Sequence, residues 1–372
     1  MKILICASEY YPYGSGIANV AYNVVEQLKK MGVDCTVCSP TGPEIKLGSS
    51  KLIEKTGIIG LLYYWHRVFK YFKGQENDFD VVWHHNPLFL KRNPFQRSII
   101  TIHTTYYGKV IQELNPKMYN KVASAIERYC LNKINEKARF TAVSPQVCKE
   151  LDEIGVSKQR MIYIPNGADT KLFKPSDKKK SIRKKFGIPE DDLIFLSLGR
   201  LSKAKQPFKL IKVFSVIEKV MDDVTLVITG KGELSEKTKE FSRQKNWKNI
   251  IFLGYVDERD KPPLYACSDY YIITSKYEGQ PLTLMEAMSS GLPCIVSDIP
   301  NLRVVDAANC GIIVNFDDIG KAAADIIGYL YKDKSENSKN AREYAVNNLD
   351  WQIIAGRYLE EFEKIVFEKE GQ

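Results

Sequence analysis

Two glutamates lie eight positions apart around a segment rich in glycine and proline. The segment runs Ser275-Lys276-Tyr277-Glu278-Gly279-Gln280-Pro281, and Glu286 follows it. A strand is predicted before the segment and a helix after it, so Glu278 should lie in the loop and Glu286 about one turn into the helix. The N–H groups of Leu282 and Thr283 open that helix and can bind an anion. The pattern predicts a ligand with an anionic group and hydroxyls, in which Glu286 accepts from a ribose diol and Glu278 contacts a sugar.

A basic loop follows another predicted strand. Gly199-Arg200-Leu201-Ser202-Lys203-Ala204-Lys205 comes directly after the apolar run Leu193–Leu198. Ligands of open α/β sheets bind at the carboxyl ends of the strands. Arg200 could bind a diphosphate through two parallel hydrogen bonds of its guanidinium group, and Lys205 could bind it through its single positive charge. A solvated basic loop without a ligand fits the residues equally well.

A glycine loop opens the first predicted helix. The run Tyr10–Gly16 follows the strand Lys2–Ala7, and Gly16 would allow a ligand to approach the helix N-terminus. A dinucleotide fingerprint is excluded, because Asn19 stands where its third glycine is required. Taken alone, the loop fits a tight turn better than a ligand site.

The histidines and the paired aspartates are candidates for metal or catalytic chemistry. His103 ends the predicted strand Ser98–Ile102, where it would face a cleft between domains; the alternative is a structural histidine bonded to backbone. His84 and His85 are predicted to be structural, because no cysteine or carboxylate completes a metal set. Asp78-Phe79-Asp80 matches the Asp-x-Asp pattern of a metal-binding motif, but it lies far in sequence from the basic loop Gly199–Lys205. No metal site is therefore predicted.

Strands and helices alternate along the chain, and the series then restarts. This order predicts α/β architecture with parallel sheets covered on both faces. With 372 residues, two domains are expected. The break near Pro165–Pro175 predicts an N-terminal domain over 1–170 and a second doubly wound domain over 171–350. The final helix, within 351–372, could pack on either domain. Further strands are predicted at Asp34–Cys38, Val81–Trp83, Phe140–Val143, Thr225–Thr229, Ile250–Phe252, Tyr270–Ile273 and Pro293–Val296, and helices at Ala18–Lys30, Pro207–Val220 and Leu284–Ser290.

In order and spacing, these segments resemble glycosyltransferase family 4, the retaining enzymes with two Rossmann-like domains called GT-B. The resemblance implies that the domain over 1–170 lies on the acceptor side and that the domain over 171–350 binds the nucleotide-sugar donor. The resemblance covers nearly the whole chain. The matching segments are residues 8–32, Asp80–Pro87, Thr101–Thr104, Ile164–Asp169, Gly199–Lys205, Gly230–Glu233, Phe252–Val256 and Glu278–Pro293. The chain departs from the family pattern at Ser15, where a glycine usually precedes Gly16, and at Gln206, where a glycine usually follows the lysine.

The resemblance implies roles for the candidate residues. Arg200 and Lys205 would neutralise the donor diphosphate, while Glu286 would hold the ribose and the backbone near Val256 the base. His103 would lie beside the anomeric carbon. The implied donor-binding residues are Gly16, Arg200, Lys205, Val256, Glu278, Gly279, Leu282, Thr283 and Glu286, and the implied catalytic residues are His103, Glu278, Arg200 and Lys205.

The resemblance also implies a reaction. A hexose would move from a UDP- or GDP-linked donor to a hydroxyl acceptor, a glycolipid or a surface-glycan precursor, by front-face substitution. Because Arg200 and Lys205 replace a cation, no metal and no cofactor are expected. A GT-B epimerase or phosphorylase and a non-catalytic nucleotide-sugar-binding homologue are the competing interpretations.

Charge bears on where the protein acts. Residues 1–170 hold 22 Lys and Arg against 15 Asp and Glu, which accounts for +7 of the net charge of +9. The aromatic segment Ile58–Phe72 could lie on an anionic membrane surface as a helix, or it could be an ordinary core helix. The basic residues are dispersed and form no nucleic-acid-binding module, so no nucleic acid is expected. The expected location is the cytoplasm, with a peripheral position on the inner face of the membrane as the alternative if Ile58–Phe72 binds that surface.

Overall fold

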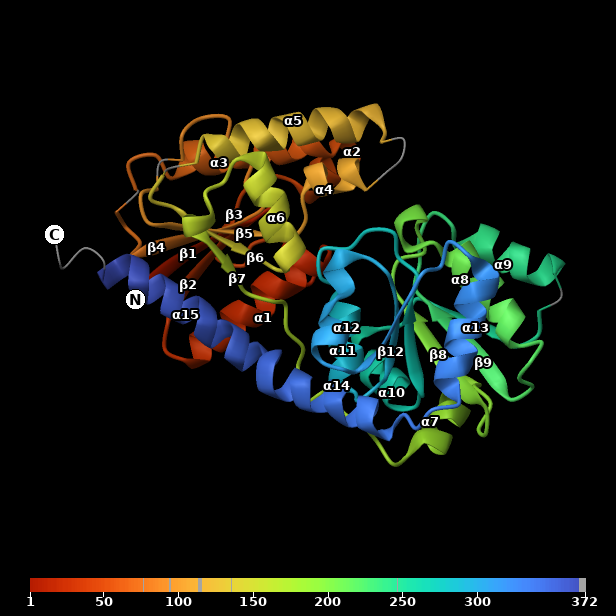
Figure 1. The fold of residues 1–372 in the computed structure, drawn as a ribbon. Coiled ribbons are helices and arrows are strands. Elements are labelled where there is room, and N and C mark those ends of the chain that lie inside the picture. The colour runs from red at the N-terminus through yellow and green to blue at the C-terminus, as the bar shows by residue number, and fades with distance from the viewer. Residues whose placement is uncertain (76, 94, 113–115, 135, 246, 368–372) are drawn as a thin grey trace. The chain divides into compact units, whose positions relative to one another are not determined.

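The computed structural model describes residues 1–75, 77–93, 95–112, 116–134, 136–245 and 247–367. The chain divides into two compact units, which are described separately. Unit 1 comprises Met1–Asn166 with Trp351–Gln372, and unit 2 comprises Gly167–Asp350. Each unit is an α/β structure around one parallel sheet (Figure 1). None of the helices in these described ranges is long and apolar enough to cross a membrane.

The sheet of unit 1 has the strand order β3-β2-β1-β4-β5-β6-β7, and the neighbouring strands pair in parallel. Its central strands are almost wholly buried, which explains why they read as continuous apolar runs. The predicted central strands are present, and the short strands β3 and β7 were missed. The strands are β1 Lys2–Ala7, β2 Asp34–Ser39, β3 Ile45–Lys46, β4 Val81–His85, β5 Ser98–Ile102, β6 Arg139–Ala142 and β7 Met161–Tyr163.

Helices cover both faces of this sheet (Figure 1). Their ends follow local rules, as α6 illustrates: Ser144 caps it by accepting from the Val147 N–H group at 3.2 Å, Pro145 begins it, and Gly155 ends it in the left-handed conformation. The helices are α1 Gly16–Lys30, α2 Ser50–Thr56, α3 Ile58–Tyr71, α4 Tyr106–Ile111, α5 Met118–Asn132, α6 Pro145–Ile154 and α15 Trp351–Phe367.

The last helix, α15, belongs to unit 1. Tyr358 packs its ring on Trp83 with centroids 4.7 Å apart, and its hydroxyl lies 3.2 Å from that of Thr101. Thr101 also accepts from the Trp83 indole at 2.7 Å and meets the Thr141 hydroxyl at 2.6 Å. This buried network attaches α15 to unit 1, whereas the sequence allowed either domain. Residues 368–372, which were included in the predicted segment, lie outside the described residues.

Helix α3 combines the two alternatives considered for its sequence. Tyr64, Trp65 and Val68 are buried in the core of unit 1, so its inner face is an ordinary core face. Ile59 is 68% exposed on the outer face, where Tyr63 and Tyr71 are also exposed. The helix is therefore amphipathic, with an apolar component on its solvent side.

The sheet of unit 2 has the order β10-β9-β8-β11-β12-β13 and is also parallel. Strand β8 lies between β9 and β11, so the loops after β8 and β11 leave from the same edge of the sheet. The final strand β13 was not predicted. The strands are β8 Leu193–Leu198, β9 Val224–Thr229, β10 Ile250–Gly254, β11 Tyr270–Ile273, β12 Cys294–Ser297 and β13 Gly311–Val314.

The helices of unit 2 enclose two apolar cores, one on each face of its sheet. Helix α8 begins with Pro207, a residue that suits the first helical turn because its missing N–H group would be unpaired there anyway. The helices are α7 Lys179–Phe186, α8 Pro207–Ile217, α9 Ser235–Gln244, α10 Lys261–Ala266, α11 Leu282–Ser289, α12 Val304–Ala307, α13 Ile319–Leu330 and α14 Ser335–Asn348.

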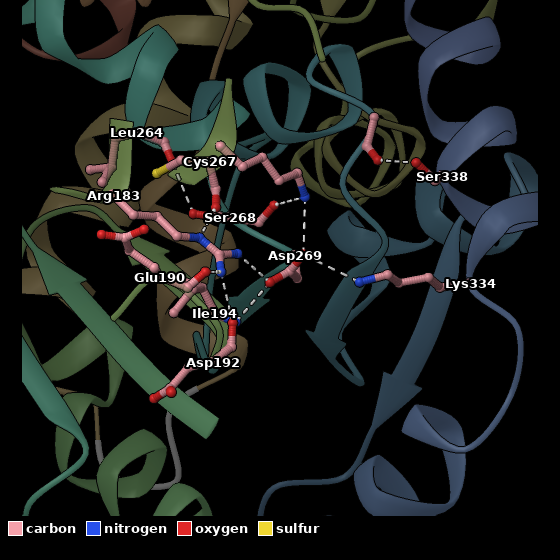
Figure 2. A network of polar contacts seen from close by, with 12 residues as sticks. Arg183, Glu190, Asp192, Ile194, Leu264, Cys267, Ser268, Asp269, Lys334 and Ser338 are labelled. Carbon is pink, nitrogen blue, oxygen red and sulfur yellow. Dashed lines mark hydrogen bonds and ion pairs between the residues drawn. The ribbon is translucent and has the colours of Figure 1, made fainter. Parts of the chain in front are cut away.

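A polar network around Asp269 ties α7 and the chain before α14 to the amino-terminal edge of this sheet (Figure 2). The Asp269 carboxylate accepts from Lys179 at 2.9 Å, Arg183 at 2.6 Å and Lys334 at 3.3 Å, and from the Ile194 N–H group at 2.9 Å. Burial alone would raise the pKa of Asp269. The lysines and the N–H group outweigh burial and lower this pKa to about 2.

Candidate functional site

Lys205 and Glu278, which are 73 positions apart in sequence, form an ion pair in unit 2. Lys205 ends the short 3₁₀ turn Lys203–Lys205 after β8, and Glu278 lies in the loop after β11. The Ser275 hydroxyl donates to the same carboxylate, and the Asn301 amide donates to the backbone carbonyl of Glu278. Glu278 is thus buried and held in one orientation, while Lys205 remains partly exposed.

Arg200 lies beside this pair without a partner of its own. Its side chain is exposed and makes no polar contact in the described part of the chain. It lines a shallow depression, of about 380 Å³ when the space open to solvent is included, together with Gly199, Lys205, Ser275 and Thr283. The depression lies at the carboxyl ends of β8 and β11, where the sequence predicted ligand binding.

Close backbone packing shapes the floor of this region. Gly230 has a φ of +125°, and a Cβ atom there would lie 1.9 Å from the carbonyl oxygen of Gly199. The Gly230 N–H group donates to the carbonyl of Gly254 at 2.6 Å. Glycine is required at position 230 because any side chain would push the Arg200 loop away from β9.

The first turn of α11 presents unpaired donors near the same depression. Pro281 caps the helix without a side-chain hydrogen bond, and the N–H groups of Leu282 and Thr283 have no acceptor among the described residues. Further along the helix, the Glu286 carboxylate accepts from the Tyr265 hydroxyl at 2.9 Å. Burial raises the pKa of Glu286, with Lys261 and Tyr265 acting in the opposite direction. The helix start can therefore bind an anion, and the second Glu286 oxygen can accept from a hydroxyl.

Val256 follows β10 and turns its side chain into the core of unit 2. The turn is made at Gly254, whose φ is +72°. In the described structure the N–H and carbonyl groups of Val256 have no backbone partner. These groups could pair with the edge of a base, as the sequence predicted for this position.

His103 and Gly16 belong to unit 1. The buried His103 ring has its Nε2 2.9 Å from Nδ1 of His85, and the two rings stack with centroids 5.2 Å apart. Its N–H group donates to Asn86 Oδ1 at 2.9 Å. Burial lowers the pKa of His103 to about 3, so the imidazole is neutral at pH 7.

The pairing of His85 with His103 was missed, because His85 was predicted to follow its strand and to be merely structural. It is the last residue of β4, and β4 pairs with β5, the strand that leads to His103. His84 is enclosed by Trp65, Phe89 and Phe95, as expected for a structural residue.

Gly16 is the exposed first residue of α1, and the preceding Ser15 caps the helix. The Glu9 carboxylate accepts from both the N–H group and the hydroxyl of Ser15, each at 2.6 Å. Glu9 was not among the predicted residues. No sequence motif identifies Glu9, because its role depends on how the loop after β1 folds back to bring Glu9 to Ser15 at the start of α1.

Models of two protein families match the chain in succession. Glycosyltransferase Family 4 matches residues 14–172, and Glycosyl transferases group 1 matches residues 178–348. The chain belongs to glycosyltransferase family 4. The two matches fall on the two α/β units, so the family accounts for both halves of the fold.

Individual relatives of this family 4 chain agree with that classification. The UDP-Gal:alpha-D-GlcNAc-diphosphoundecaprenol alpha-1,3-galactosyltransferase of Escherichia coli is 31% identical over 213 residues, which are 55% of this chain and 54% of that protein. The match thus spans about half the length of that relative. Sucrose-phosphate synthase from Thermosynechococcus elongatus superposes with a TM-score of 0.79 at 18% identity, covering 99% of this chain and 100% of that one. The glycosyltransferase WaaG, involved in lipopolysaccharide biosynthesis, superposes with a TM-score of 0.76 at 17% identity over 100% of both chains. These likenesses show the fold, two Rossmann-like domains of the GT-B type.

In the described ranges, no three His, Cys, Asp or Glu side chains gather as metal ligands would. Asp80, in the motif that resembles a metal site, instead accepts from the Lys2 N–H group at 2.7 Å. The eight cysteines are free thiols, including Cys35 and Cys38 on β2.

Proposed function

We propose that this chain is a retaining glycosyltransferase that moves a hexose from a UDP- or GDP-linked donor to a hydroxyl acceptor. The observation that carries the proposal is the cation arrangement at the carboxyl edge of the unit 2 sheet. There Arg200 is unpaired, Lys205 is held by Glu278, and two N–H groups at the start of α11 have no acceptor. Such a set of hydrogen-bond donors suits a diphosphate.

The reaction follows from where charge develops. As the bond between the anomeric carbon and the β-phosphate oxygen breaks, negative charge grows on the leaving diphosphate. Arg200 and Lys205 stabilise that charge, and each fixed donor of this kind is typically worth about 10²–10³ in rate. The acceptor oxygen attacks the same face of the anomeric carbon, and its proton passes to the departing phosphate. The configuration is thereby retained.

The remaining predicted residues orient the donor. Glu286 holds the ribose hydroxyls, the backbone of Val256 pairs with the base, and Glu278 with Gly279 contacts the hexose. Glu278 therefore has two roles, since it positions Lys205 and also contacts the sugar. Gly16 adds an N–H group to the diphosphate, and the neutral His103 contacts the sugar near its anomeric carbon. No metal or cofactor takes part in this scheme, because the two cations perform the charge neutralisation.

The acceptor is proposed to be lipid-linked. The Escherichia coli relative is named for UDP-galactose as donor and for an N-acetylglucosamine on a diphosphoundecaprenol lipid as acceptor. A glycolipid or surface-glycan precursor fits an enzyme that works from the cytoplasm at the inner face of the membrane.

A surface of unit 1 supports this membrane proposal. Helices α3 and α5 meet where the Tyr119 hydroxyl accepts from the Ile58 N–H group at 3.0 Å. Exposed apolar or aromatic side chains on these helices are Ile59, Tyr63, Tyr71, Met118, Tyr119, Val122 and Tyr129. Exposed lysines accompany them at Lys55, Lys70, Lys73, Lys117 and Lys121. Apolar side chains flanked by lysines are the composition that binds an anionic membrane interface.

Flotation with lipid vesicles tests the membrane surface. The full chain should float with vesicles containing anionic lipid and less with zwitterionic ones, and the double substitution Ile59→Glu with Met118→Glu should abolish flotation. The matched control is Tyr331→Glu, which places a charge at an exposed aromatic position of unit 2. Equal flotation of the double variant and the wild type would rule this surface out.

Nucleotide release tests the reaction itself. UDP-, GDP- and ADP-hexoses are incubated with the protein and an acceptor-lipid extract in the presence of EDTA, with Glu278→Ala as the inactive reference. Release from one donor by the wild type alone supports both the donor class and metal independence. Nucleotide binding without any transfer would favour the non-catalytic homologue, and an altered sugar on an intact donor would favour the epimerase.

A further inference from the structure

The first half of helix α8 in unit 2 borders a groove that none of the proposed donor-binding residues lines. The groove comprises about 950 Å³ when the space open to solvent is included, within the range of small-molecule sites. Its other walls come from the chain just before α9 and from the segment that joins β13 to α13. Among the described lining residues, only Pro207 also lines the depression beside Arg200. The polar side chains of the groove are Lys203, Gln206, Lys209, Lys212 and Asp317.

Positive charge predominates in this groove, because three lysines line it against one aspartate. Lys209 donates to the Asp317 carboxylate at 2.6 Å, but the two side chains differ in exposure: that of Lys209 is 22% exposed and that of Asp317 is 86% exposed. The hydrogen bond from Lys209 lowers the pKa of Asp317, and the charge of Lys276 lowers it further. An ion pair with so exposed a carboxylate contributes little to stability. A bound anion can therefore take the place of Asp317 on Lys209.

Two more side chains in the groove have donors to spare. Lys212 lies over the Phe241 ring, 5.9 Å from its centroid, and forms no ion pair with the described residues. Gln206 has a φ of +51°, a left-handed conformation that side chains disfavour, at the position where the family pattern has glycine. Its side-chain amide does not cap α8 and has no hydrogen-bond partner in the described structure. The chain thus keeps an amide at this position against the preference of the backbone, and the amide lines the groove.

The remaining lining of the groove is mostly apolar. Phe208, Leu234 and Ile319 contribute to it, and the Phe208 ring packs edge-on against Phe241 with centroids 5.4 Å apart. Apolar walls favour a ligand that buries carbon atoms against them. The groove therefore suits a molecule with an anionic group at one end and a carbon body at the other.

We propose that this groove is a second anion site, which binds the phosphate monoester of an apolar or aromatic small molecule. Lys209, Lys212 and the Gln206 amide donate to the phosphate, whose three terminal oxygens match three donor groups; a carboxylate has only two oxygens. The apolar walls contact the carbon body. The inference goes beyond the proposed function, because it does not depend on glycosyl transfer and gives Arg200 no part in binding this ligand.

Four variants separate this groove from the rest of unit 2. Lys212→Gln removes one charged donor at an exposed position, where the fold is not at risk. Lys219→Gln is the matched control, because it removes the same charge from an exposed residue just beyond the end of α8, outside the lining. Gln206→Gly removes the amide and suits the left-handed backbone conformation. Arg200→Ala removes the guanidinium from the neighbouring depression and leaves the lining of the groove intact.

Binding is measured on the full chain with three probes. Phenyl phosphate, inorganic phosphate and benzoate are titrated by ligand-observed NMR. The wild type should bind phenyl phosphate about 10-fold more tightly than either of the other two, because inorganic phosphate lacks the carbon body and benzoate lacks one oxygen. Lys212→Gln should raise the Kd for phenyl phosphate about 10-fold, the effect of one hydrogen bond to a charged group, and Gln206→Gly about 3-fold. Lys219→Gln and Arg200→Ala should leave this Kd unchanged.

Each contrary outcome has a definite meaning. Loss of phenyl phosphate binding in Arg200→Ala, with no effect of Lys212→Gln, would place the phosphate in the depression beside Arg200 and overturn the inference. Benzoate or inorganic phosphate that binds as tightly as phenyl phosphate overturns the assigned ligand class. Absence of saturable phenyl phosphate binding to the folded wild type overturns the site itself. A failure of the proposed function would appear as absent nucleotide release and would leave these titrations interpretable, because none of them uses a sugar donor.

Discussion

Two charged clusters lie at opposite edges of the same sheet in unit 2, and they are built differently. At the amino-terminal edge every charged group of the Asp269 cluster is satisfied: Asp269 has four donors, and Arg183 also donates to the carbonyls of Cys267, Glu190 and Asp192 (Figure 2). At the carboxyl-terminal edge Lys205 and Glu278 pair, but Arg200 and the first N–H groups of α11 have no partner in the described structure.

Under the proposed function, the difference separates charges that stabilise the fold from charges that bind a ligand. A buried charge whose partner is removed is costly, typically about 3–5 kcal/mol, so removal of one member of a saturated cluster lowers the free energy of unfolding. An exposed cation without a partner contributes little to that free energy. It retains its hydrogen-bonding capacity for a bound anion. The comparison therefore predicts opposite responses to substitution at the two edges.

The largest effect is expected at Asp269. Asp269→Ala leaves the buried Arg183 without its carboxylate and should lower the free energy of unfolding by about 3–5 kcal/mol, measured by urea denaturation. At 25 °C the fraction that remains folded should keep its rate of transfer. Asp191→Ala, which removes the exposed partner of Lys180, is the control and should cost less than about 1 kcal/mol. A small cost at Asp269 would mean that the cluster is not structural.

The next largest effect is expected at Arg200, and it concerns rate instead of stability. Arg200→Ala should lower kcat by about 10²–10³-fold, because one fixed donor to the leaving diphosphate is lost. The urea concentration at the midpoint of denaturation should be the same for Arg200→Ala as for the wild type. Lys203→Ala in the same loop is the control, and its kcat should match the wild type. If Arg200→Ala also unfolds the protein, the charges at the carboxyl-terminal edge contribute to stability, and the proposed contrast with the Asp269 cluster is wrong.

Acid should destabilise unit 2 through the Asp269 cluster. The folded pKa of Asp269 is about 2, below the value of about 3.9 expected in the unfolded chain. A depressed folded pKa means that the stabilisation is complete above pH 4 and is lost as the pH falls towards 2, by about 2 kcal/mol in all. Urea denaturation of wild type and Asp269→Asn at pH 5, 4 and 3 measures it. The two curves should converge as the pH falls, and parallel curves would contradict the assigned cause.

Sequence patterns predicted the strands better than the contacts between them. Strands such as β1 and β8 are buried on both faces and read as apolar runs, whereas β3 and β7 are too short, at two and three residues, to carry a pattern. The ion pair of Lys205 with Glu278 depends on β8 and β11 being neighbours, which alternation of strands and helices does not specify.

The polar groups that were missed have the same origin. His85 and His103 meet because β4 and β5 are adjacent, and Glu9 acts through the return of a loop to α1. The cations around Asp269 come from Lys179 to Lys334 along the chain and share no motif. Motifs led to the proposed donor-site residues because the spacing of each motif lies within one loop, whereas the saturated cluster around Asp269 is assembled only by the fold.

The smallest effect is expected at Tyr265, a core residue whose hydroxyl bonds to Glu286 of the proposed donor site. Its ring is buried in the core of unit 2, while its hydroxyl donates to Glu286 at 2.9 Å and lies 3.1 Å from the Thr283 carbonyl. Tyr265→Phe should lower the free energy of unfolding by about 1 kcal/mol. It should also raise KM for the donor several-fold with little change in kcat, because Glu286 loses the group that orients it.

Tyr329→Phe is the matched control, since the Tyr329 hydroxyl bonds to Asn337 on α14 in another part of unit 2. It should cost a similar free energy of unfolding and leave KM for the donor unchanged. If both variants change stability alone, Glu286 does not depend on Tyr265 to hold the ribose. If Tyr265→Phe lowers kcat as strongly as Arg200→Ala, then Glu286 acts on the leaving group, and the carboxyl edge of the sheet has a wider catalytic set than the two cations.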